Sequence, residues 1–412
     1  MNTRRMTALL LTIIMLTMVL GTGLSETEKI TQYQSGDYFY TKDEEDNVTI
    51  FSWHGKDKAL IIPDQLDGYP VTAIGEQAFS SELVTEVVVP EGVTRIHQHA
   101  FSSNYLLTKV TLPGSLTTID RSAFSFCKKL TDINLPEGLI ALGEMAFSGC
   151  DVLEDIRLPD SLREIAGNPF INVSNIKISL SEEHPVFSLV DGVLFDHVNK
   201  TLVVYPKASP ASAYTVPEGT RAIGNSAFRG STNLERLILP DSLEHLGDQS
   251  ISFCSNLRSI TLPDNLMSMG ANPFWGAKEL YVSVRPDHPV FEVIDEVLFN
   301  HQTKTLIYYP SILKAREYTV PEGTQVIGAY AFYKAARLRH IALPDGLTTI
   351  ERGAFSDCTG LGDLTIPDSV TSMMDSIFSN RSSRLRLLVT PGSLAEEYAK
   401  KNRIDYAEND AT

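Results

Sequence analysis

The stretches LPGSLTTIDRSAFSFCKKL (residues 112–130), LPEGLIALGEMAFSGCDVL (135–153) and LPDGLTTIERGAFSDCTGL (343–361) repeat one pattern. Each begins with a leucine and an anchoring proline. Such prolines recur every 23 residues within three groups and after 58 residues between groups. A fixed period of this kind is typical of a solenoid, in which each unit packs only against its neighbours. The anchoring prolines are Pro90, Pro113, Pro136, Pro159, Pro217, Pro240, Pro263, Pro321, Pro344 and Pro367.

Each repeat contains two sets of apolar residues, one on each side of the proline. Before it, Leu130, Ile133 and Leu135 alternate with polar residues, which predicts a half-buried strand. After a turn, Leu139 and Leu142 form the second set. An Ala-Phe pair follows, and we expect its phenylalanines to stack in a buried column on the convex side. The pairs are Ala100-Phe101, Ala123-Phe124, Ala146-Phe147, Ala227-Phe228, Ala331-Phe332 and Ala354-Phe355.

A larger repeat is superimposed on the small one. Residues 159–230 and 263–334 align at an offset of 104. Within them, VLFDHVNKTLVVYP reads as a strand, a polar turn and a second strand. We therefore expect two lengthened units, at 171–214 and 275–318, each carrying a β-hairpin.

The phrases AFSGC, LPxSL…IG and GVLF…KTLxxYP resemble the BspA-like leucine-rich repeats of bacterial surface proteins. The resemblance covers about 59–406. It implies a curved, right-handed leucine-rich-repeat superhelix that is exported and serves adhesion or host-matrix binding. Together with the strand pattern, the expected fold is a strand-rich α/β repeat solenoid.

The N-terminus is typical of a secretory signal peptide, expected at 1–25. Arg4 and Arg5 precede the mostly apolar run Met6–Leu20, and small residues follow at 23–25. The alternative is an uncleaved anchor, but the run is shorter than the roughly 20 residues that span a bilayer. We expect a secreted or cell-surface protein without a transmembrane span once the signal is removed.

The expected solenoid, 59–389, has about eleven units and a cap at each end. Residues 26–58 predict an N-terminal β cap, and 390–412 a C-terminal helical cap and tail. Ser393 and Glu396 match a capping box. Leu394, Tyr398 and Ala399 share one helical face that we expect on the final coil. Asn402 is the expected stop.

Composition argues against several classes of function. The formal net charge is −16, and the chain has no cluster of Lys and Arg, so a nucleic-acid partner is not expected. We interpret the excess of acidic residues as favouring the solubility of an extracellular protein. A calcium site is the weaker interpretation, because no DxDxDG-like loop is present. The four cysteines, Cys127, Cys150, Cys254 and Cys358, share one phase and predict a small buried apolar slot. A Cys127–Cys150 disulfide is the alternative.

No catalytic motif is present, so we expect no enzyme, and no cofactor or metal site is predicted. The best metal candidates are two histidine pairs near Asp191 or Asp295. The alternative is that the first histidine of each pair shapes the HPVF turn while the second is solvated. The pairs are His184 with His197 and His288 with His301. Trp275 replaces Ile171 between the copies, and it is either an exposed anchor or a packed aromatic.

A ligand is expected on the concave strand face, at the outward positions two and four residues before the proline. The mixed polar character of these residues favours a broad contact with a protein, such as a host or extracellular-matrix protein. A structural scaffold of the cell envelope is the alternative. The candidate residues are Lys109, Thr111, Asp132, Asn134, Asp155, Arg157, Arg236, Ser259, Thr261, His340 and Asp363.

Overall fold

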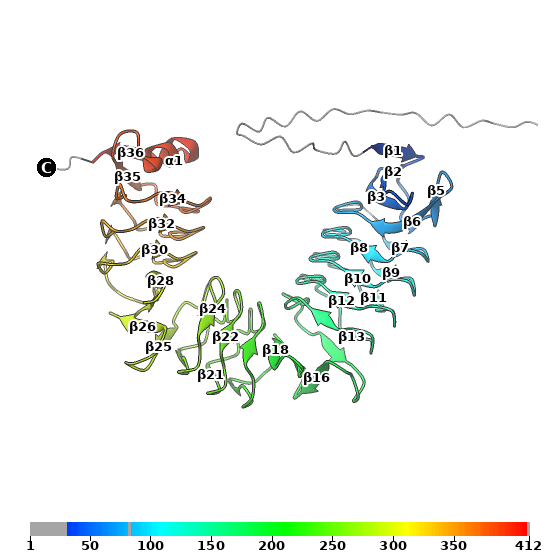
Figure 1. The fold of residues 1–412 in the computed structure, drawn as a ribbon, viewed down its shortest axis with the longest axis horizontal. Helices are drawn as coiled ribbons and strands as arrows, with labels where there is room; N and C mark the ends of the chain where they lie inside the picture. Colours follow the sequence, from blue (N-terminus) through cyan, green and yellow to red (C-terminus); the bar gives the residue numbers. More distant parts are fainter. Residues whose placement is uncertain (1–30, 81–83, 410–412) are drawn as a thin grey trace, which may run out of the picture. The chain divides into compact units, whose positions relative to one another are not determined.

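The computed structural model describes residues 31–80 and 84–409. The expected signal peptide lies outside the described residues. The chain divides into two compact units, one ending at Leu194 and the other beginning at Phe195, and each is described by itself. In both units, short strands of successive coils lie side by side in parallel ladders (Figure 1).

The first unit opens with three antiparallel strands and continues as a ladder of coils. β1 (Gln32–Ser35) and β2 (Tyr38–Lys42) pair antiparallel, as do β2 and β3 (Val48–Trp53). β3 then pairs in parallel with the first coil. The strands before each proline are β4 (Ala59–Ile61), β7 (Glu86–Val88), β9 (Lys109–Thr111), β11 (Asp132–Ile133), β13 (Asp155–Arg157) and β15 (Lys177–Ser179). Those after it are β6 (Tyr69–Ile74), with β5 (Gln65–Leu66) antiparallel to it, β8 (Arg95–Ile96), β10 (Thr118–Ile119), β12 (Ala141–Leu142) and β14 (Glu164–Ile165).

The second unit repeats the same two ladders. The strands of the first ladder are β19 (Ala213–Thr215), β21 (Arg236–Ile238), β23 (Ser259–Thr261), β25 (Tyr281–Ser283), β29 (Glu317–Thr319), β31 (His340–Ala342), β33 (Asp363–Thr365) and β35 (Arg386–Val389), with β36 (Asp405–Glu408) beside β35. All except β25 and β35 precede an anchoring proline, and these two pair with β23 and β33. The strands after the anchoring proline are β20 (Ala222–Ile223), β22 (His245–Leu246), β24 (Ser268–Met269), β30 (Val326–Ile327), β32 (Thr349–Ile350) and β34 (Ser372–Met373).

The lengthened coil in the second unit carries three antiparallel strands rather than two. β27 (Val297–Asn300) pairs with β28 (Thr305–Tyr308), which is the expected hairpin, and β26 (Phe291–Ile294) pairs with β27 on the other side. β28 then pairs in parallel with β30 and so joins the ladder of coils. The equivalent sequence positions of the first copy form β16 (Phe187–Val190), β17 (Val193–Asp196) and β18 (Thr201–Val204).

The α part of the expected α/β fold is wrong, because the described residues contain a single α-helix. The segment around each Ala-Phe pair is a tight turn with left-handed residues nine and thirteen positions after the proline. Two left-handed residues so close together prevent a regular helix from forming. Examples are His99 and Ser103, Ser122 and Phe126, Met145 and Gly149, and Tyr330 and Lys334.

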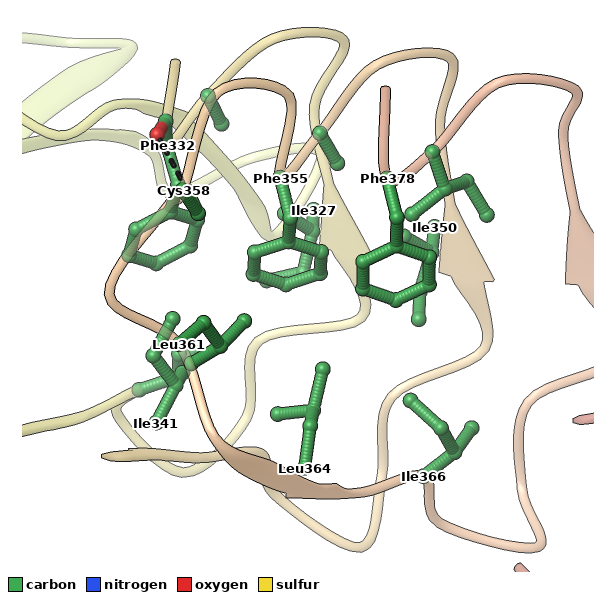
Figure 2. Packing of buried hydrophobic residues seen from close by; sticks show 14 of the residues in the cluster. Ile327, Phe332, Ile341, Ile350, Phe355, Cys358, Leu361, Leu364, Ile366 and Phe378 are labelled. Atoms are coloured by element: carbon green, nitrogen blue, oxygen red, sulfur yellow. Dashed lines mark hydrogen bonds between the residues drawn. The ribbon is translucent and has the colours of Figure 1, made fainter. Parts of the chain in front are cut away.

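The phenylalanine column is buried as expected, and it is held by hydrogen bonds as well as by packing. In the first unit, the rings of Phe101 and Phe124 stack with centroids 5.2 Å apart, and the next pair is 5.7 Å apart. The main-chain N–H of Phe101 donates to the oxygen of Ala123 at 2.8 Å. In the second unit, Phe332, Phe355 and Phe378 form a row of rings, and the aliphatic side chains of Ile341, Leu361, Leu364 and Ile366 lie below it in the view of Figure 2.

The single helix covers the last coil. α1 (Leu394–Asn402) begins after Ser393, whose hydroxyl accepts from the N–H of Glu396 at 3.3 Å. The Glu396 carboxylate accepts from the N–H of Gly392 at 2.9 Å. The expected inner face is wrong for Leu394, which is 37% exposed; Ala395 takes its place beside Tyr398 and Ala399. Residues three and four positions apart lie on the same face of a helix. Ala395 therefore shares the buried face with Tyr398 and Ala399, whereas Leu394 points outward.

Candidate functional site

The predicted binding residues lie on what we call the first-strand face, defined as the outward side chains of the strands before each proline. In these strands the middle residue is buried and its two neighbours point out, as in Lys109, Val110 and Thr111 of β9. Alternation of this kind follows from the two-residue period of a strand. All of the predicted residues are exposed except Asp363, which is half-buried.

The structure does not bring these residues together into one site. Six lie in the first unit and five in the second. In the first unit, Lys109, Thr111 and Asp132 belong to a four-stranded sheet, Asn134 follows its last strand, and β13 pairs separately with β15. In the second unit, Arg236, Ser259 and Thr261 share the four-stranded sheet β19-β21-β23-β25. His340 and Asp363 lie in two further sheets.

Most of the charged members are neutralised by partners on adjacent coils. Lys109 Nζ lies 2.9 Å from Asp132 Oδ2, and this contact raises the pKa of the lysine. Arg157 pairs with Glu137. Arg386 pairs with Asp363 at 2.5 Å and lowers the pKa of that carboxyl. Opposite charges at facing positions of neighbouring strands stabilise a sheet, so these residues have a structural use.

Sequence reasoning missed Tyr281, which enriches the face of the second unit. Tyr281 in β25 is 42% exposed and lies directly beside Ser259, which in turn is in register with Arg236. Ile238, in the same sheet, is 38% exposed. The prolines that follow Tyr281, Pro286 and Pro289, are not anchoring prolines of the repeat, so the count from anchoring prolines skipped this strand. The alternation LYVSV at 280–284 was the available signal.

The histidine pairs do not form a metal site. The ring of His288 is buried, with Nε2 3.0 Å from the oxygen of Pro263 and Nδ1 accepting from the N–H groups of Val290 and Phe291. His184 makes the same contacts in the first copy, with Pro159, Val186 and Phe187. Both ring nitrogens are occupied, so the first histidine of each pair shapes the HPVF turn. Among residues 31–80 and 84–409, no group of three or more His, Cys, Asp or Glu residues could hold a metal.

All four cysteines are buried free thiols, so the alternative disulfide between Cys127 and Cys150 is not formed. The expected slot is small and buried, but it is not purely apolar. Each thiol lies within hydrogen-bonding distance of the main-chain oxygen of a phenylalanine in the preceding coil, at 3.2 Å from Phe101 in the case of Cys127. Burial raises the pKa of Cys127 to about 12, which keeps the thiol protonated and able to donate.

The described part of the chain has no membrane-spanning helix, since α1 has nine residues and no other helix is present there. A bilayer-spanning helix needs roughly 20.

Comparison with one solved structure supports the fold, and two further similar structures are given with it. The chain is similar to a leucine-rich repeat protein from Eubacterium ventriosum, with a TM-score of 0.53 and 21% identity over 84% of this chain and 94% of that one. It is also similar to a leucine rich cell surface protein from Faecalibacterium prausnitzii, with a TM-score of 0.41 and 21% identity over 93% and 95% of the two chains. A third is the pneumococcal vaccine antigen PcpA, with a TM-score of 0.48 and 19% identity over 92% and 98%. No curated protein matches the chain at a significant level.

The family comparison covers most of the chain. The model of the BspA type leucine rich repeat region matches six times, over residues 58–185, 207–319 and 307–397. These ranges contain the strand ladders and the phenylalanine columns of both units. The chain therefore belongs to the family of BspA type leucine-rich repeat proteins.

Proposed function

We propose that this chain is an exported, non-enzymatic binding protein that contacts a protein partner through its first-strand face. Export is supported by Arg4, Arg5 and the apolar run Met6–Leu20. A binding role is supported by the repeat architecture, because stacked coils present long, regular surfaces without requiring a catalytic pocket. A host or extracellular-matrix protein at the cell surface is the partner class that the family resemblance implies.

The observation that carries this proposal is the composition of the sheet β19-β21-β23-β25. Arg236 makes no ion pair with any described residue, and two apolar side chains, Ile238 and Tyr281, are exposed on the same sheet. Arginine and tyrosine are enriched among the residues that contribute most to protein interfaces. Arg236 and Tyr281 lie on either side of the small residue Ser259 in consecutive strands, so two large side chains flank a small one.

The first unit provides a natural contrast. Arg236 stands four residues before its anchoring proline, and at the same position two strands of the first unit carry Lys109 and Asp132. These two form an ion pair, with Lys109 Nζ 2.9 Å from Asp132 Oδ2. A partner that bound there would have to break this ion pair or bury it, and burying paired charges brings little net affinity. We therefore assign the contact to the second unit.

The proposal is tested by comparing three proteins without the signal peptide: wild type, a double variant Arg236→Ser and Tyr281→Lys, and a control variant Lys109→Ser. Serine is the residue at this phase in β23, and lysine is the residue that the first copy has at 177. Immobilised matrix glycoproteins and cell-envelope proteins are offered to each. We expect binding that the double variant weakens at least tenfold and the control leaves unchanged.

A different result supports the scaffold alternative. If each protein recovers only its own chain, and sedimentation shows self-association of the wild type, then the face serves assembly and the proposed binding function is wrong. If a partner binds all three proteins equally, the contact lies elsewhere on the chain.

A further inference from the structure

Four aromatic residues gather on the surface of the second unit, on the side of the Ala-Phe turns. The aromatic cluster consists of Phe253, Trp275, Tyr330 and Tyr333. The Trp275 ring is central: its centroid lies 4.7 Å from those of Phe253 and Tyr330 and 5.7 Å from that of Tyr333. All four are partly exposed. Both sequence-based alternatives for Trp275 therefore hold in part, since it is packed and still reaches solvent.

The orientation of the indole leaves carbon surface for a ligand. Trp275 Nε1 is buried and has no hydrogen-bond partner in the described part of the chain. The exposed part of the ring is thus carbon. The guanidinium of Arg229 lies 5.2 Å from the centroid of the Trp275 ring and 4.7 Å from that of the Phe253 ring. These cation–π contacts hold the two rings in place at the edge of the cluster.

A cleft of about 480 Å³ adjoins the cluster and is rich in positive charge. Lys334 connects the two, because it lines the cleft and its Nζ lies 5.1 Å from the centroid of the Tyr333 ring in the cluster. Lys278 and Arg337 line the cleft as well. We call this the cationic cleft; its lining residues are Lys278, Glu279, Ser311, Ile312, Lys334, Ala336, Arg337, Asp357 and Thr359.

The positive charges of the cleft are not neutralised internally. Lys278, Lys334 and Arg337 are exposed and form no ion pair with any described residue. Of the two carboxylates, Glu279 is paired with Arg258. Asp357 keeps its negative charge, since its described partner, Asn380 Nδ2 at 3.1 Å, is neutral, and the three cations outnumber it. A local positive excess stands out in a chain whose formal net charge is −16. It complements a ligand that carries several negative charges.

The internal duplication provides independent support. The two copies agree in the residues that build the fold: NPF, HPVF, VLF, KTL and YTVPEGT occur in both. However, Trp275, Tyr330, Lys278, Lys334 and Arg337 have neither an aromatic nor a cationic residue 104 positions earlier, and Tyr333 has a cationic residue there in place of an aromatic one. The first copy has Ile171, Ser174, Ser226, Arg229, Gly230 and Asn233 at the positions of Trp275, Lys278, Tyr330, Tyr333, Lys334 and Arg337. The coil thus folds without this set of side chains, so folding alone does not require them.

We propose that the aromatic cluster and the cationic cleft form a binding site for an anionic polysaccharide, a chain of pyranose units bearing carboxylate or sulfate groups. Aromatic rings carry a negative face, which attracts the C–H groups on the flat side of a pyranose ring. The ammonium and guanidinium groups bind the acidic substituents. Ser311 and Thr359, which also line the cleft, supply hydroxyl groups suited to those of a sugar. This site is separate from the first-strand face and does not depend on the proposed function.

The chain allows a direct optical test, because it has only two tryptophans. Trp53 is buried in the first unit, so Trp53→Phe leaves Trp275 as the single reporter. In this background, the full chain without its signal is titrated with polygalacturonate and with dextran sulfate while tryptophan fluorescence is recorded. Neutral dextran, polyglutamate and a single-stranded oligonucleotide are the comparison probes. We expect a saturable change with at least one anionic polysaccharide, and much weaker responses with the comparison probes.

Variants taken from the first copy identify the site. The triple variant Lys278→Ser, Lys334→Gly and Arg337→Asn introduces residues that the equivalent coil already accommodates. Each exposed charge contact contributes modestly, so the three together are expected to weaken binding roughly tenfold. The matched control removes three exposed lysines of the first unit, Lys56, Lys58 and Lys129, and should bind like wild type. Trp275→Ile, followed by affinity electrophoresis, should also weaken binding.

Several results would overturn the proposal. They are an absence of response to both anionic polysaccharides, equal binding of polyglutamate or the oligonucleotide, equal binding of neutral dextran, or wild-type affinity in the triple variant. Far-UV circular dichroism and the urea midpoint of each variant establish that it is folded. A variant that fails to fold is replaced by its single substitutions, of which Lys334→Gly is the safest because φ is 59° at this position.

Discussion

The thiol of Cys358 donates a hydrogen bond to the main-chain oxygen of Phe332, 3.0 Å away in the preceding coil (Figure 2). Cys127, Cys150 and Cys254 make the same contact one coil back, each at 3.2 Å. The repeated cysteine is therefore a donor that joins one turn of the solenoid to the next. A cysteine is small and carries no charge when protonated, so it suits this buried slot, where a charged group would be unfavourable.

Asn104 occupies the same slot and makes stronger contacts. Its Nδ2 donates to the oxygens of Phe79 and Phe101 at 2.7 and 2.9 Å, and the residue is fully buried. Asn104→Ala removes both bonds and should lower the free energy of unfolding by about 1–3 kcal/mol. Asn104→Cys should lose less, because a thiol restores one donor. Urea midpoints of the two variants provide the test, and equal losses would contradict a donor role for the slot.

Stability should fall at alkaline pH. Burial raises the pKa of Cys127, Cys254 and Cys358 to about 12, from an ordinary value of 9.0. Between these values the folded chain keeps protons that the unfolded chain releases, so the free energy of unfolding decreases as pH rises above about 9. Urea midpoints between pH 8 and 10 measure this effect, to which tyrosines with a raised pKa, such as Tyr38 and Tyr40, add at the upper end of the range.

The control for this pH dependence is a variant with alanine at the three cysteines. It should be less stable at pH 8 but show a flatter profile up to pH 10. A profile as steep as that of wild type would mean that other groups are responsible.

The phenylalanine column should account for a large share of the stability of each coil. Phe124 is fully buried between two stacked rings, whereas Phe126, two residues later, is 47% exposed. Phe124→Ala should cost about 3–5 kcal/mol, since it leaves a large cavity. Phe126→Ala is the matched control and should cost no more than about 0.5 kcal/mol. Similar losses in thermal or urea unfolding would contradict the assignment of Phe124 to the core.

The repeat made the core predictable, while the local conformation of its turns was not. Leu130, Ile133 and Phe124 are buried at the phases that their spacing indicated. The absence of a helix after the second strand depends on left-handed residues such as Ser122 and Phe126. Serine and phenylalanine do not by themselves predict a left-handed conformation. The hydrogen bonds between coils impose it on these residues. The sequence pattern therefore predicts which side chains are inside better than it predicts the path of the chain between strands.

The candidate binding residues illustrate a second limit. Counting from the proline correctly identified outward positions such as Lys109 and Arg236, because strand alternation is local. Whether an outward charge is available depends on its neighbour in the next coil, which pairs with Lys109 but not with Arg236. Trp275 and Tyr330 are in contact although the three antiparallel strands of the lengthened coil stand between them in the sequence. Contacts across such an insertion cannot be obtained from a 23-residue period.

His288 should be essential for the lengthened coil, and His301 should not. His288→Ala removes the acceptor for two buried N–H groups and the contact with the oxygen of Pro263, at an expected cost of about 2–4 kcal/mol. His301 is exposed, so His301→Ala should cost no more than about 0.5 kcal/mol. Added zinc should leave the unfolding midpoint of the wild type unchanged, because both ring nitrogens of His288 are occupied. A zinc-dependent rise that both variants abolish would restore the metal interpretation.

The C-terminal cap provides a last test, on the stability of the end of the solenoid. The Ser393 hydroxyl accepts from the N–H of Glu396 and starts the helix, while the Tyr398 hydroxyl accepts from the N–H of Ile377 in the final coil at 3.1 Å. Ser393→Ala should cost about 1 kcal/mol, because the N–H of Glu396 loses its acceptor at the N-cap. Ser383→Ala, at an exposed loop position, is the control and should change nothing measurable. Hydrogen exchange should show faster opening of β35 and α1 in the Ser393 variant, because a frayed helix uncovers the last coil. Uniform destabilisation of all coils would instead mean that the cap and the solenoid unfold as one cooperative unit.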